Sequence, residues 1–480
     1  MLPSKYNEIL GEFNDLLTSG EKVVFKTLSI YRTIELDKIK IKVPDAPQGK
    51  HNKSDILLLM LLYPLFCLKN VYQYSNSNYK GLLEASKNTF YRFKNNSLIP
   101  WRSILYRIVG KLNNQIRERG TQDNESAKCL IIDDTDLPKT GKCIEHSGMI
   151  WSHTIRRSIL GFKGLFLGLW DSKSFIILDY SLHKEKGKNS KKPYGLKKKE
   201  IKRQYHKKRS EESAGCKREG ELLINKIDNA ISLIRRARAN GVNVEYVLMD
   251  SWFVCEKMIR FVIGIGSDLI GMVKMGKTTY MYKGRRRSAK AIVSSLKRDG
   301  KVRMLKRLHM YATDVIVEMK GVPVRLFFFK NTQRGKWNVL LSTKTDLSAT
   351  KAYEIYSIRW SIEVFFKEAK KYFGLGKSQS RDFNAQIADI SISMIQYNIF
   401  SVAKRFTSYE TLGALFNETK DTVMELTICK RLWGFILELL AMLADIFDVD
   451  MEEVMSRIIE LPEQENRFLK IMQRSAHVAA

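Results

Sequence analysis

The spacing of the apolar residues changes near residue 128, and this change defines the fold class of the chain. Before that point, apolar residues recur at helical spacing, most clearly at 6–17, 56–68 and 103–117. Beyond it, short apolar runs rich in β-branched residues alternate with helical stretches. Residues 1–125 are therefore predicted to form a helical region, and the part that follows is predicted to contain a β-sheet.

Strands and helices are expected to alternate after this change. CLIIDDT at 129–135 predicts a strand, and the segments 162–170 and 174–182 predict a hairpin joined at 171–173. The next predicted elements are a helix at 219–238 that ends near Gly241, a strand at 244–250, a helix at 252–265 and a strand at 268–275. A meander of three strands followed by this alternation is an α/β plan, and it resembles the RNase H-like fold.

The rest of the chain completes a division into three parts. Residues 276–335 carry short alternating strands with basic turns, and WNVLLST at 337–343 predicts one more core strand. A long helix is expected at 349–373, which closes a catalytic domain at 126–375 with a β-rich insertion at 276–335. Residues 376–480 return to helical spacing and end in an acidic stretch, which favours packing or self-association over DNA contact.

The charge of the chain points to a polyanionic partner. Lysine and arginine number 82 and aspartate and glutamate 51, so the formal net charge is 82 − 51 = +31. Such an excess favours nucleic acid first and an anionic membrane surface second. A short basic helix is expected in LLEASKNTFYRFKNN at 82–96, where Ser86 can cap it, and its position after another helix has helix-turn-helix character. The alternative is a surface helix of a bundle.

Residues 184–218 are the most basic stretch, with fifteen lysines and arginines against four glutamates, a local net charge of +11. Because like charges at this density do not pack against one another, a solvated arm or loop is expected. An arm that follows the phosphates of nucleic acid is favoured over a loop that is merely solvated.

Other sequence features indicate the cellular compartment of the protein. The longest apolar run, at 56–68, has thirteen residues including Pro64, too few for the roughly 20 that a membrane span needs. The N-terminus lacks the pattern of a secretory signal, and the six cysteines include no CxxC pair. These features predict an intracellular protein with reduced thiols and no membrane partner.

Three acidic positions follow apolar strands. Asp133 and Asp134 are expected to close one strand, and Asp250 another. If the two strands are parallel neighbours, their ends meet at the edge where α/β sheets hold their sites. The alternative for each is a turn or helix-capping residue, above all for Asp250, because a helix could begin just after it.

The predicted helix at 349–373 adds polar residues on one face. Tyr356, Arg359, Glu363 and Lys370 stand at i, i+3, i+7 and i+14, within an arc of about 60° at roughly 100° per residue. The adjacent apolar stripe, which would anchor the helix to the sheet, consists of Ile355, Ile358, Ile362, Phe366, Ala369 and Phe373. The alternative is an ordinary surface stripe with a local Arg359–Glu363 ion pair.

These segments together resemble a known family. YSIRWSIEVFFKEAK at 356–370 reproduces a Tyr-x2-Arg-x3-Glu-x6-Lys signature. LIIDDTDLPKTG at 130–141 and YVLMDSWF at 246–253 are similar to the first and second aspartate segments of the same family. The chain resembles bacterial insertion-sequence transposases of the DDE class, specifically the IS-four-type family, over roughly residues 125–375.

The resemblance implies a set of catalytic residues. Asp133, Asp250 and Glu363 would match a triad of carboxylates that binds two divalent metal ions, normally Mg2+, for which Mn2+ can substitute. Asp134 is the alternative first ligand. The resemblance implies that the three carboxylates converge on the metal ions.

The resemblance also implies DNA-contacting residues. Arg359 and Lys370 would match a phosphate-contacting pair, and Tyr356 a tyrosine near the scissile end. The family inserts a domain where the β-rich stretch at 276–335 lies, and uses a tryptophan there to hold a flipped base. This chain has no tryptophan between Trp252 and Trp337.

The implied function is that of a cut-and-paste transposase, a DNA endonuclease and strand transferase of DNA recombination. It would bind the terminal inverted repeats of its element through the N-terminal helices and the basic arm, and join the released ends to target DNA. A homodimer is expected in the DNA complex, in the bacterial cytoplasm and associated with the nucleoid. Two alternatives stay open, namely an inactive DNA-binding protein derived from a transposase and an RNase H-like nuclease acting on RNA.

Overall fold

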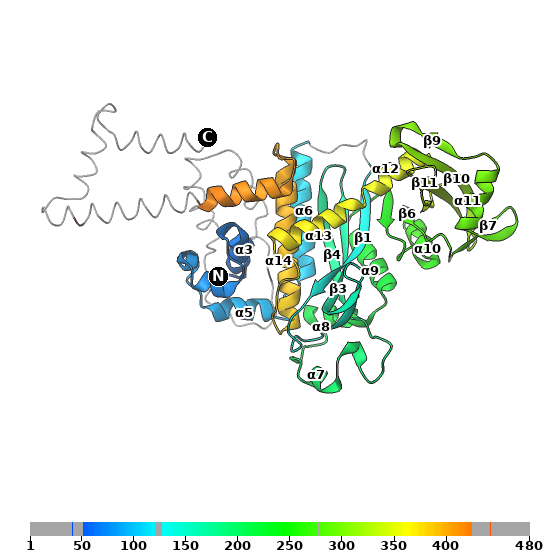
Figure 1. Ribbon diagram of the computed structural model, residues 1–480. Coiled ribbons are helices and arrows are strands. Elements are labelled where there is room, and N and C mark those ends of the chain that lie inside the picture. The colour runs from blue at the N-terminus through cyan, green and yellow to red at the C-terminus, as the bar shows by residue number, and fades with distance from the viewer. Residues whose placement is uncertain (1–40, 42–50, 121–126, 277, 425–441, 443–480) are drawn as a thin grey trace, which may run out of the picture. The chain divides into compact units, whose positions relative to one another are not determined.

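The computed structural model describes residues 41, 51–120, 127–276, 278–424 and 442 (Figure 1). The chain forms two compact units, one of Met1–Phe93 with Ala403–Ala480 and one of Lys94–Val402. The helix predicted at 6–17 and the acidic C-terminal end, with its expected self-association, lie outside the described residues.

The first unit is helical where it is described. Its elements are α3 (Lys53–Leu62), η1 (Tyr63–Phe66), α4 (Val71–Ser75), η2 (Asn78–Leu82), the start of α5 (Lys87–Asn95) and a helical stretch at 412–424. The apolar run at 56–68 is confirmed as the buried helices α3 and η1. The short basic helix is confirmed as α5, which buries Phe90 and Phe93. In the described part of the chain, no helix has the length and apolar character that crossing a membrane requires.

One mixed sheet runs through the second unit, so the predicted α/β class is confirmed. Its strand order is β2-β3-β1-β5-β6-β12-β11-β10-β7-β8, with β4 paired to β3 and β9 paired to β10. The strands are β1 (Cys129–Pro138), β2 (Gly148–Ser152), β3 (Arg157–Trp170), β4 (Phe175–His183), β5 (Tyr246–Met249), β6 (Asp268–Met272), β7 (Thr279–Tyr282), β8 (Arg285–Ser288), β9 (Arg303–Leu305), β10 (Met310–Met319), β11 (Val322–Lys330) and β12 (Asn338–Ser342).

The strands nearest the chain's acidic positions follow the predicted order. β1, β3 and β4 form an antiparallel meander, and β1, β5 and β6 are parallel neighbours. The apolar residues of β1 and β5 are buried on both faces of the sheet, which is typical of parallel strands covered by helices. One expectation was wrong: β1 does not close at Asp133 and Asp134, because its pairing with β3 continues to Pro138.

The second unit contains helices as well as this sheet (Figure 1). They are α6 (Trp101–Glu118), α7 (Lys198–Lys202), α8 (Ala214–Gly220), α9 (Lys226–Ala239), α10 (Glu256–Gly264), α11 (Ala289–Arg298), α12 (Ala349–Ser357), α13 (Trp360–Tyr372) and α14 (Phe383–Arg405), with the short 3-10 helices η3 (Pro193–Gly195), η4 (Glu221–Leu223) and η5 (Lys306–Leu308). The helix predicted at 219–238 begins later, as α9, and the helix predicted at 252–265 begins later, as α10.

Two helices from the flanking regions of the sequence belong to the sheet unit. α6 packs on β4, and the Asn398 side chain of α14 exchanges two hydrogen bonds of 2.8 Å with the backbone of Ile177 on the same strand. β4 pairs on one side only, so Asn398 satisfies backbone groups that the sheet leaves open. The compact unit at Lys94–Val402 therefore extends beyond both ends of the catalytic domain predicted at 126–375.

The β-rich insertion extends the same sheet. β12 pairs with β6 and β11 with β12, so the predicted strands are confirmed as a continuation of the central sheet. A helix among them, α11, was not predicted. Ser288 caps α11, since its Oγ accepts a hydrogen bond from Ala291 N at 3.3 Å, and the helix buries Ile292, Val293 and Leu296.

The prediction of one long helix at 349–373 was wrong in one respect, because the structure has two helices there, α12 and α13. Backbone bonds at the junction join residues three apart, as from Arg359 N to Tyr356 O at 3.0 Å and from Ser361 N to Ile358 O at 3.0 Å. Such 3-10 bonds tighten the helix locally and change the direction of the side chains that follow.

The basic run at 184–218 is not a solvated arm throughout, which corrects the expectation from its charge. It contains η3, α7 and most of α8, and it buries Arg218 and the Arg209 side chain. The physical reason is that its buried cations pair with carboxylates from other parts of the chain, so they need not pack against one another.

Candidate active site

Asp133 and Asp250 lie at equivalent places on two parallel strands. Ile132 of β1 pairs with Met249 of β5, and this is the last pair of that ladder. Asp133 and Asp250 are the next residue of each strand, so both carboxyl groups lie at one edge of the sheet, as expected. The buried apolar pairs before them hold the two backbones in register.

A turn positions Asp250. Its Oδ1 accepts a hydrogen bond from Trp252 N at 2.9 Å, and its backbone carbonyl accepts one from Phe253 N at 3.3 Å. Asp250 therefore caps a turn rather than the following helix. Gly271 on β6 leaves room for this turn, because a Cβ there would lie 2.4 Å from Val254 Cγ2.

The positive charge near the Asp133 carboxyl group does not offset its burial and the negative charge of Asp250. Burial raises its pKa, Arg359 lowers it and nearby Asp250 raises it again, with a result of about 7. Its side chain keeps 16% exposure. A carboxyl group in this state binds a proton near neutral pH, and it favours any cation that can approach it.

Arg359 joins Asp133 to Glu363. Its Nη1 donates to Asp133 Oδ2 at 2.8 Å, and its Nη2 forms a short hydrogen-bonded ion pair with Glu363 Oε1. α13 is anchored for this contact by the buried side chains Ile362, Phe365, Phe366 and Ala369. The Arg359–Glu363 pair is therefore part of a tertiary arrangement with β1, and the alternative of a purely local surface pair does not describe it.

Asp134 belongs to the other face of β1. Successive residues of a strand point to opposite faces, and Asp134 Oδ2 accepts a hydrogen bond from Lys226 Nζ of α9 at 2.7 Å. Lys163 Nζ lies 4.0 Å from Asp134 Oδ1. Asp133 is thus the member of the pair that lies beside Asp250 and Arg359.

The remaining residues of the helical signature lie along β1. The pKa of Tyr356 is raised to about 12, mainly by burial, with Arg359 lowering it and Asp250 and Asp133 raising it, so the Tyr356 side chain lies close to the carboxylates. Lys370 Nζ donates to Thr135 Oγ1 at 2.7 Å, and burial lowers its pKa. The four signature residues therefore share one side of β1.

Carboxylate oxygens are the ligands that Mg2+ prefers, and Asp133 and Asp250 offer them side by side. Within the described ranges, no group of three histidine, cysteine, aspartate or glutamate side chains is arranged to hold a metal ion. The Arg359 guanidinium lies between Asp133 and Glu363 and supplies positive charge to both. Glu363 would be able to join the other two carboxylates only after Arg359 releases it.

Lys226 and Trp252 were not singled out from the sequence. Lys226 Nζ lies 4.1 Å from the centre of the Trp252 ring, and that ring is 44% exposed. Lys226 follows the helix cap Asn225, and no spacing in the sequence connects it with Asp134. Trp252 stands inside YVLMDSWF, so its place two residues after Asp250 was the available signal.

Two family models match parts of the chain that contain residues of the candidate active site. Residues 224–399 match the family model described as a transposase DDE domain, and residues 79–307 match the model described as a DDE superfamily endonuclease. The first stretch includes Asp250 and Glu363, and the second includes Asp133 and Asp250. No curated protein matches the chain.

Two solved structures show a distant likeness. A piggyBac transposase synaptic complex with hairpin DNA is 12% identical, with a TM-score of 0.41 over 86% of this chain and 79% of that one. The NurA nuclease from Sulfolobus solfataricus is 11% identical, with a TM-score of 0.21 over 53% and 81%. Both likenesses are too weak to carry an argument. The two family matches, by contrast, support a DDE-type transposase or endonuclease.

Proposed function

We propose that this chain is the DNA transposase of an IS-four-type insertion sequence, with an RNase H-like catalytic core. It would bind the terminal inverted repeats of its element, cleave the DNA strands there and transfer them to target DNA. The observation that carries the proposal is the placement of Asp133 and Asp250 directly after paired residues of two parallel strands, with Arg359, just before α13, joining Asp133 to Glu363.

The donor set fits a divalent metal. Asp133, Asp250 and Glu363 would hold Mg2+, or Mn2+ in its place, because hard cations prefer carboxylate oxygens. When bound, two such ions supply an activated oxygen nucleophile and stabilise the leaving 3′ oxygen. Burial leaves Asp133 with a raised pKa, so this carboxylate gains most from a cation.

The basic residues of the signature would position the DNA strand. The forked Arg359 guanidinium suits a phosphate as well as a carboxylate, so it can exchange Asp133 or Glu363 for the scissile strand. Lys370 lies farther along β1 at Thr135, where it can contact a flanking phosphate. Tyr356 packs beside Arg359 and limits its movement, with 5.8 Å between the guanidinium carbon and the ring centre.

The net charge of +31 supports duplex DNA as the partner. α5 with its basic residues is proposed to contribute to recognition of the repeats. Because transfer of two transposon ends needs two active sites, a homodimer is proposed in the DNA complex.

A cleavage assay tests the function. The substrate is DNA from the flank of the coding region that contains the inverted repeats, incubated with Mg2+ or Mn2+. Wild-type protein should cut at the end of the repeat, and Glu363→Gln and Asp133→Asn should bind the DNA without cutting it. Glu354→Gln makes the same change on α12, where Glu354 pairs with Arg307 at 2.9 Å, and should leave cleavage intact.

The alternatives give different outcomes in the same experiment. If wild type and Glu363→Gln both bind DNA and neither cleaves it with either metal, the enzymatic proposal is wrong. If RNA of the same sequence displaces the duplex DNA and is itself cleaved, the protein is a ribonuclease instead.

A further inference from the structure

Residues 186–203 form a strongly basic surface, called the basic surface below. They hold nine lysines and arginines, all of them exposed, and the single acidic residue Glu200. The mechanism proposed above does not use these residues, which are separate in sequence from the signature on α13. Charge of this density on one segment favours contact with several phosphates at once.

The basic surface is seated closely against β2. A Cβ on Gly195, which has a φ of +70°, would lie 2.6 Å from Met149 Cβ, and a Cβ on Gly148 would lie 3.1 Å from Tyr194 Cβ. Trp151 N donates to Glu185 Oε2 at 2.9 Å, just before the basic surface begins. Only glycine allows the backbone at position 195 to lie this close to Met149, so the η3 turn packs at a defined position on β2.

The far end of the basic surface is attached to the loop that follows β1. Lys142 Nζ lies 2.6 Å from Glu200 Oε1, and Tyr205 N donates to Cys143 O at 2.9 Å. Gln204 is buried, and its side-chain amide donates to Ser147 O at 2.8 Å. These backbone and amide contacts hold both sides of α7 against the sheet unit.

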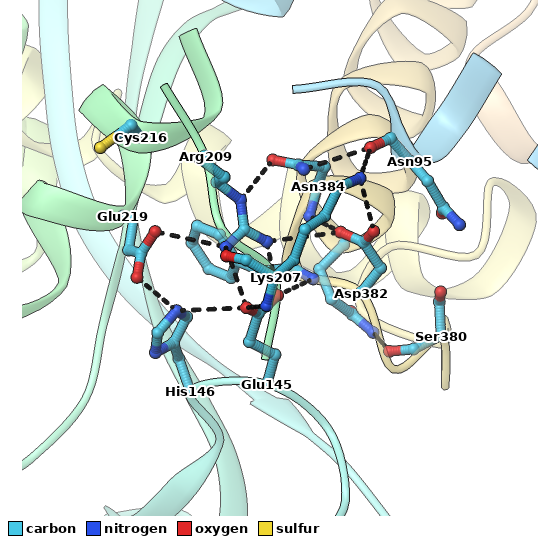
Figure 2. A network of polar contacts seen from close by, with 12 residues as sticks. Asn95, Glu145, His146, Lys207, Arg209, Cys216, Glu219, Ser380, Asp382 and Asn384 are labelled. Carbon is cyan, nitrogen blue, oxygen red and sulfur yellow. Dashed lines mark hydrogen bonds and ion pairs between the residues drawn. The ribbon is translucent and has the colours of Figure 1, made fainter. Parts of the chain in front are cut away.

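A buried network of charges completes the attachment (Figure 2). Arg209 is directed between Glu145 and Asp382, with 2.9 Å from its Nη1 to Glu145 Oε1 and 3.5 Å from its Nη2 to Asp382 Oδ1. Glu145 also accepts from Lys207 N at 3.0 Å and from Phe383 N at 2.9 Å. The Arg209 side chain is 1% exposed.

The hydrogen bonds of this network stabilise the ionised form of Glu145. Burial acts to raise the pKa of Glu145, but the hydrogen bonds from Arg209 and the backbone lower it below its usual value. Removing one partner of such a buried pair leaves an uncompensated charge, at a cost of about 3–5 kcal/mol. The segment that carries Arg209 is therefore held in place, and the basic surface with it.

The chain limits how far the basic surface lies from the carboxylates. Nine residues along β1 and its following loop lead from Asp133 to Lys142, which contacts Glu200. A fully extended chain of that length spans at most about 32 Å. The Lys142 and Glu200 side chains add about 12 Å, so at about 3.4 Å per base pair the near side of the basic surface lies within about 13 base pairs of a phosphate at Asp133.

We infer that the basic surface is a preformed binding site for the phosphates of duplex DNA flanking the scissile phosphate, positioned by the Glu145–Arg209 network. The inference rests on the proposed function, since it takes the scissile phosphate to lie at Asp133. It differs from the expectation of a solvated arm, because a fixed surface protects a defined stretch of backbone.

The first test measures DNA binding without metal, in EDTA, on a duplex several helical turns long that ends in the inverted repeat. Lys198→Glu, Lys199→Glu and Lys202→Glu are combined on α7, where all three side chains are exposed. Between about 50 and 200 mM salt, the slope of log affinity against log salt should fall by about 2–3. The matched control combines Lys290→Glu, Lys297→Glu and Lys301→Glu, which are also exposed and change the charge equally.

Hydroxyl-radical footprinting on the same complexes locates the contact. Wild type should protect backbone within about 13 base pairs of the cleavage position, and the α7 variant should lose protection there alone. An equal slope change in the control variant would show that affinity follows net charge, and the inference would then be wrong. An unchanged slope or footprint in the α7 variant would refute it as well.

The positioning role is tested with Glu145→Gln, which keeps every exposed lysine. The footprint over the flanking DNA should become weak and diffuse, while thermal unfolding shows that the protein remains folded. A sharp, wild-type footprint in the folded variant would refute the positioning role. If Glu145→Gln does not fold, the α7 variant still decides whether the basic surface binds DNA.

These outcomes separate the inference from the proposed function. If wild type cleaves the repeat-containing DNA but the α7 variant keeps its salt slope and footprint, the inference fails and the transposase proposal stands. If wild type neither binds nor cleaves this DNA, both fail.

Discussion

Two aspartates of the same sheet, Asp133 on β1 and Asp179 on β4, are both largely buried, yet their pKa values move in opposite directions. At Asp133, burial and Asp250 outweigh Arg359, and the pKa rises to about 7. At Asp179, burial also acts to raise the pKa, but arginines outweigh it, and the pKa falls below its usual value. These arginines are Arg102, Arg236 and Arg218.

The surroundings of Asp179 explain the difference. Its oxygens lie 2.7 Å from Arg102 Nε and 2.8 Å from Arg236 Nε, and Glu221 shares the same arginines. Three cations thus face two carboxylates, whereas at the candidate active site one cation, Arg359, faces Asp133 and Glu363, with Asp250 close by. A surplus of positive charge fits a structural cluster that joins α6, β4, α8 and α9, and a deficit fits a site that takes up another cation.

The largest effect is expected at the structural cluster. Asp179→Asn should lower the free energy of unfolding by about 3–5 kcal/mol, because the buried Arg218 and two partly buried arginines lose the carboxylate between them. Urea-induced unfolding followed by circular dichroism measures the loss. Asp228→Asn, at a side chain that is 45% exposed, is the matched control and should change stability by less than about 0.5 kcal/mol.

The pH dependence at this cluster has a definite sign. Since the folded pKa of Asp179 is lowered from 3.8, its stabilising effect is present above that pH and is lost as the pH falls through the folded value. Asp179→Asn should therefore be less sensitive to acid than wild type below about pH 4. Equal acid sensitivity in the two proteins would contradict the assignment.

The opposite result is expected at Asp133. In EDTA at pH 8, Asp133→Asn should raise the free energy of unfolding by about 2 kcal/mol. The shift of about three pKa units corresponds to about 4 kcal/mol, and loss of the charge-assisted hydrogen bond from Arg359 offsets about 2 kcal/mol of it. The folded pKa is raised from 3.8 to about 7, so wild type loses stability as the pH rises through this interval, and asparagine does not ionise. Unfolding at a series of pH values should give a difference that grows up to about pH 7 and then stays level.

Loss of stability in Asp133→Asn at every pH would mean that the hydrogen bond from Arg359 outweighs the burial of the charge. The contrast between the two aspartates would then not reflect a deficit of positive charge.

A smaller effect is expected from divalent cations. At a concentration tenfold above its dissociation constant, Mg2+ or Mn2+ should stabilise wild type by about 1.4 kcal/mol, seen as a higher Tm without DNA. Asp133→Asn should lose this shift, and Glu354→Gln should keep it. An equal shift in Asp133→Asn would place the cation elsewhere.

The smallest effect is expected at an exposed pair. Lys257 and Asp228 form a close ion pair, and their side chains are 64% and 45% exposed. Lys257→Ala should change the free energy of unfolding by no more than about 0.5 kcal/mol, because water and salt screen such a pair. A loss close to that of Asp179→Asn would show that pairing, and not burial, sets the size of these effects.

Much of the sheet around the candidate active site could be predicted. CLIIDDT and VEYVLMD were expected as strands because they are short, continuous apolar runs, and β1 and β5 confirm this, with their apolar residues buried on both faces of the sheet. Helical spacing also predicted that the polar residues at 356–370 share one face, and the resemblance to a family gave them roles, although neither predicted the division between α12 and α13. That division depends on backbone bonds at Ile358 and Arg359, for which the apolar stripe contains no signal.

Other features were not predictable for the same reason. The sequence around α11 has the alternating pattern of strands, so no helix was predicted there. The high charge of 184–218 predicted that the whole stretch is exposed, although Arg209 and Arg218 are buried. Their partners, Glu145, Asp179 and Asp382, include residues far away in the sequence, so no local spacing connects them.

The amino-acid sequence by itself determined most of the strands and helices around the candidate active site and the acidic positions beside them, because backbone periodicity decides which side chains share a face within one element. Only the tertiary structure decided that Arg359 joins Asp133 to Glu363, and that three arginines surround Asp179. The partner of a buried charge depends on which elements the chain topology brings together, and a pKa depends on all the charges and the burial at that place.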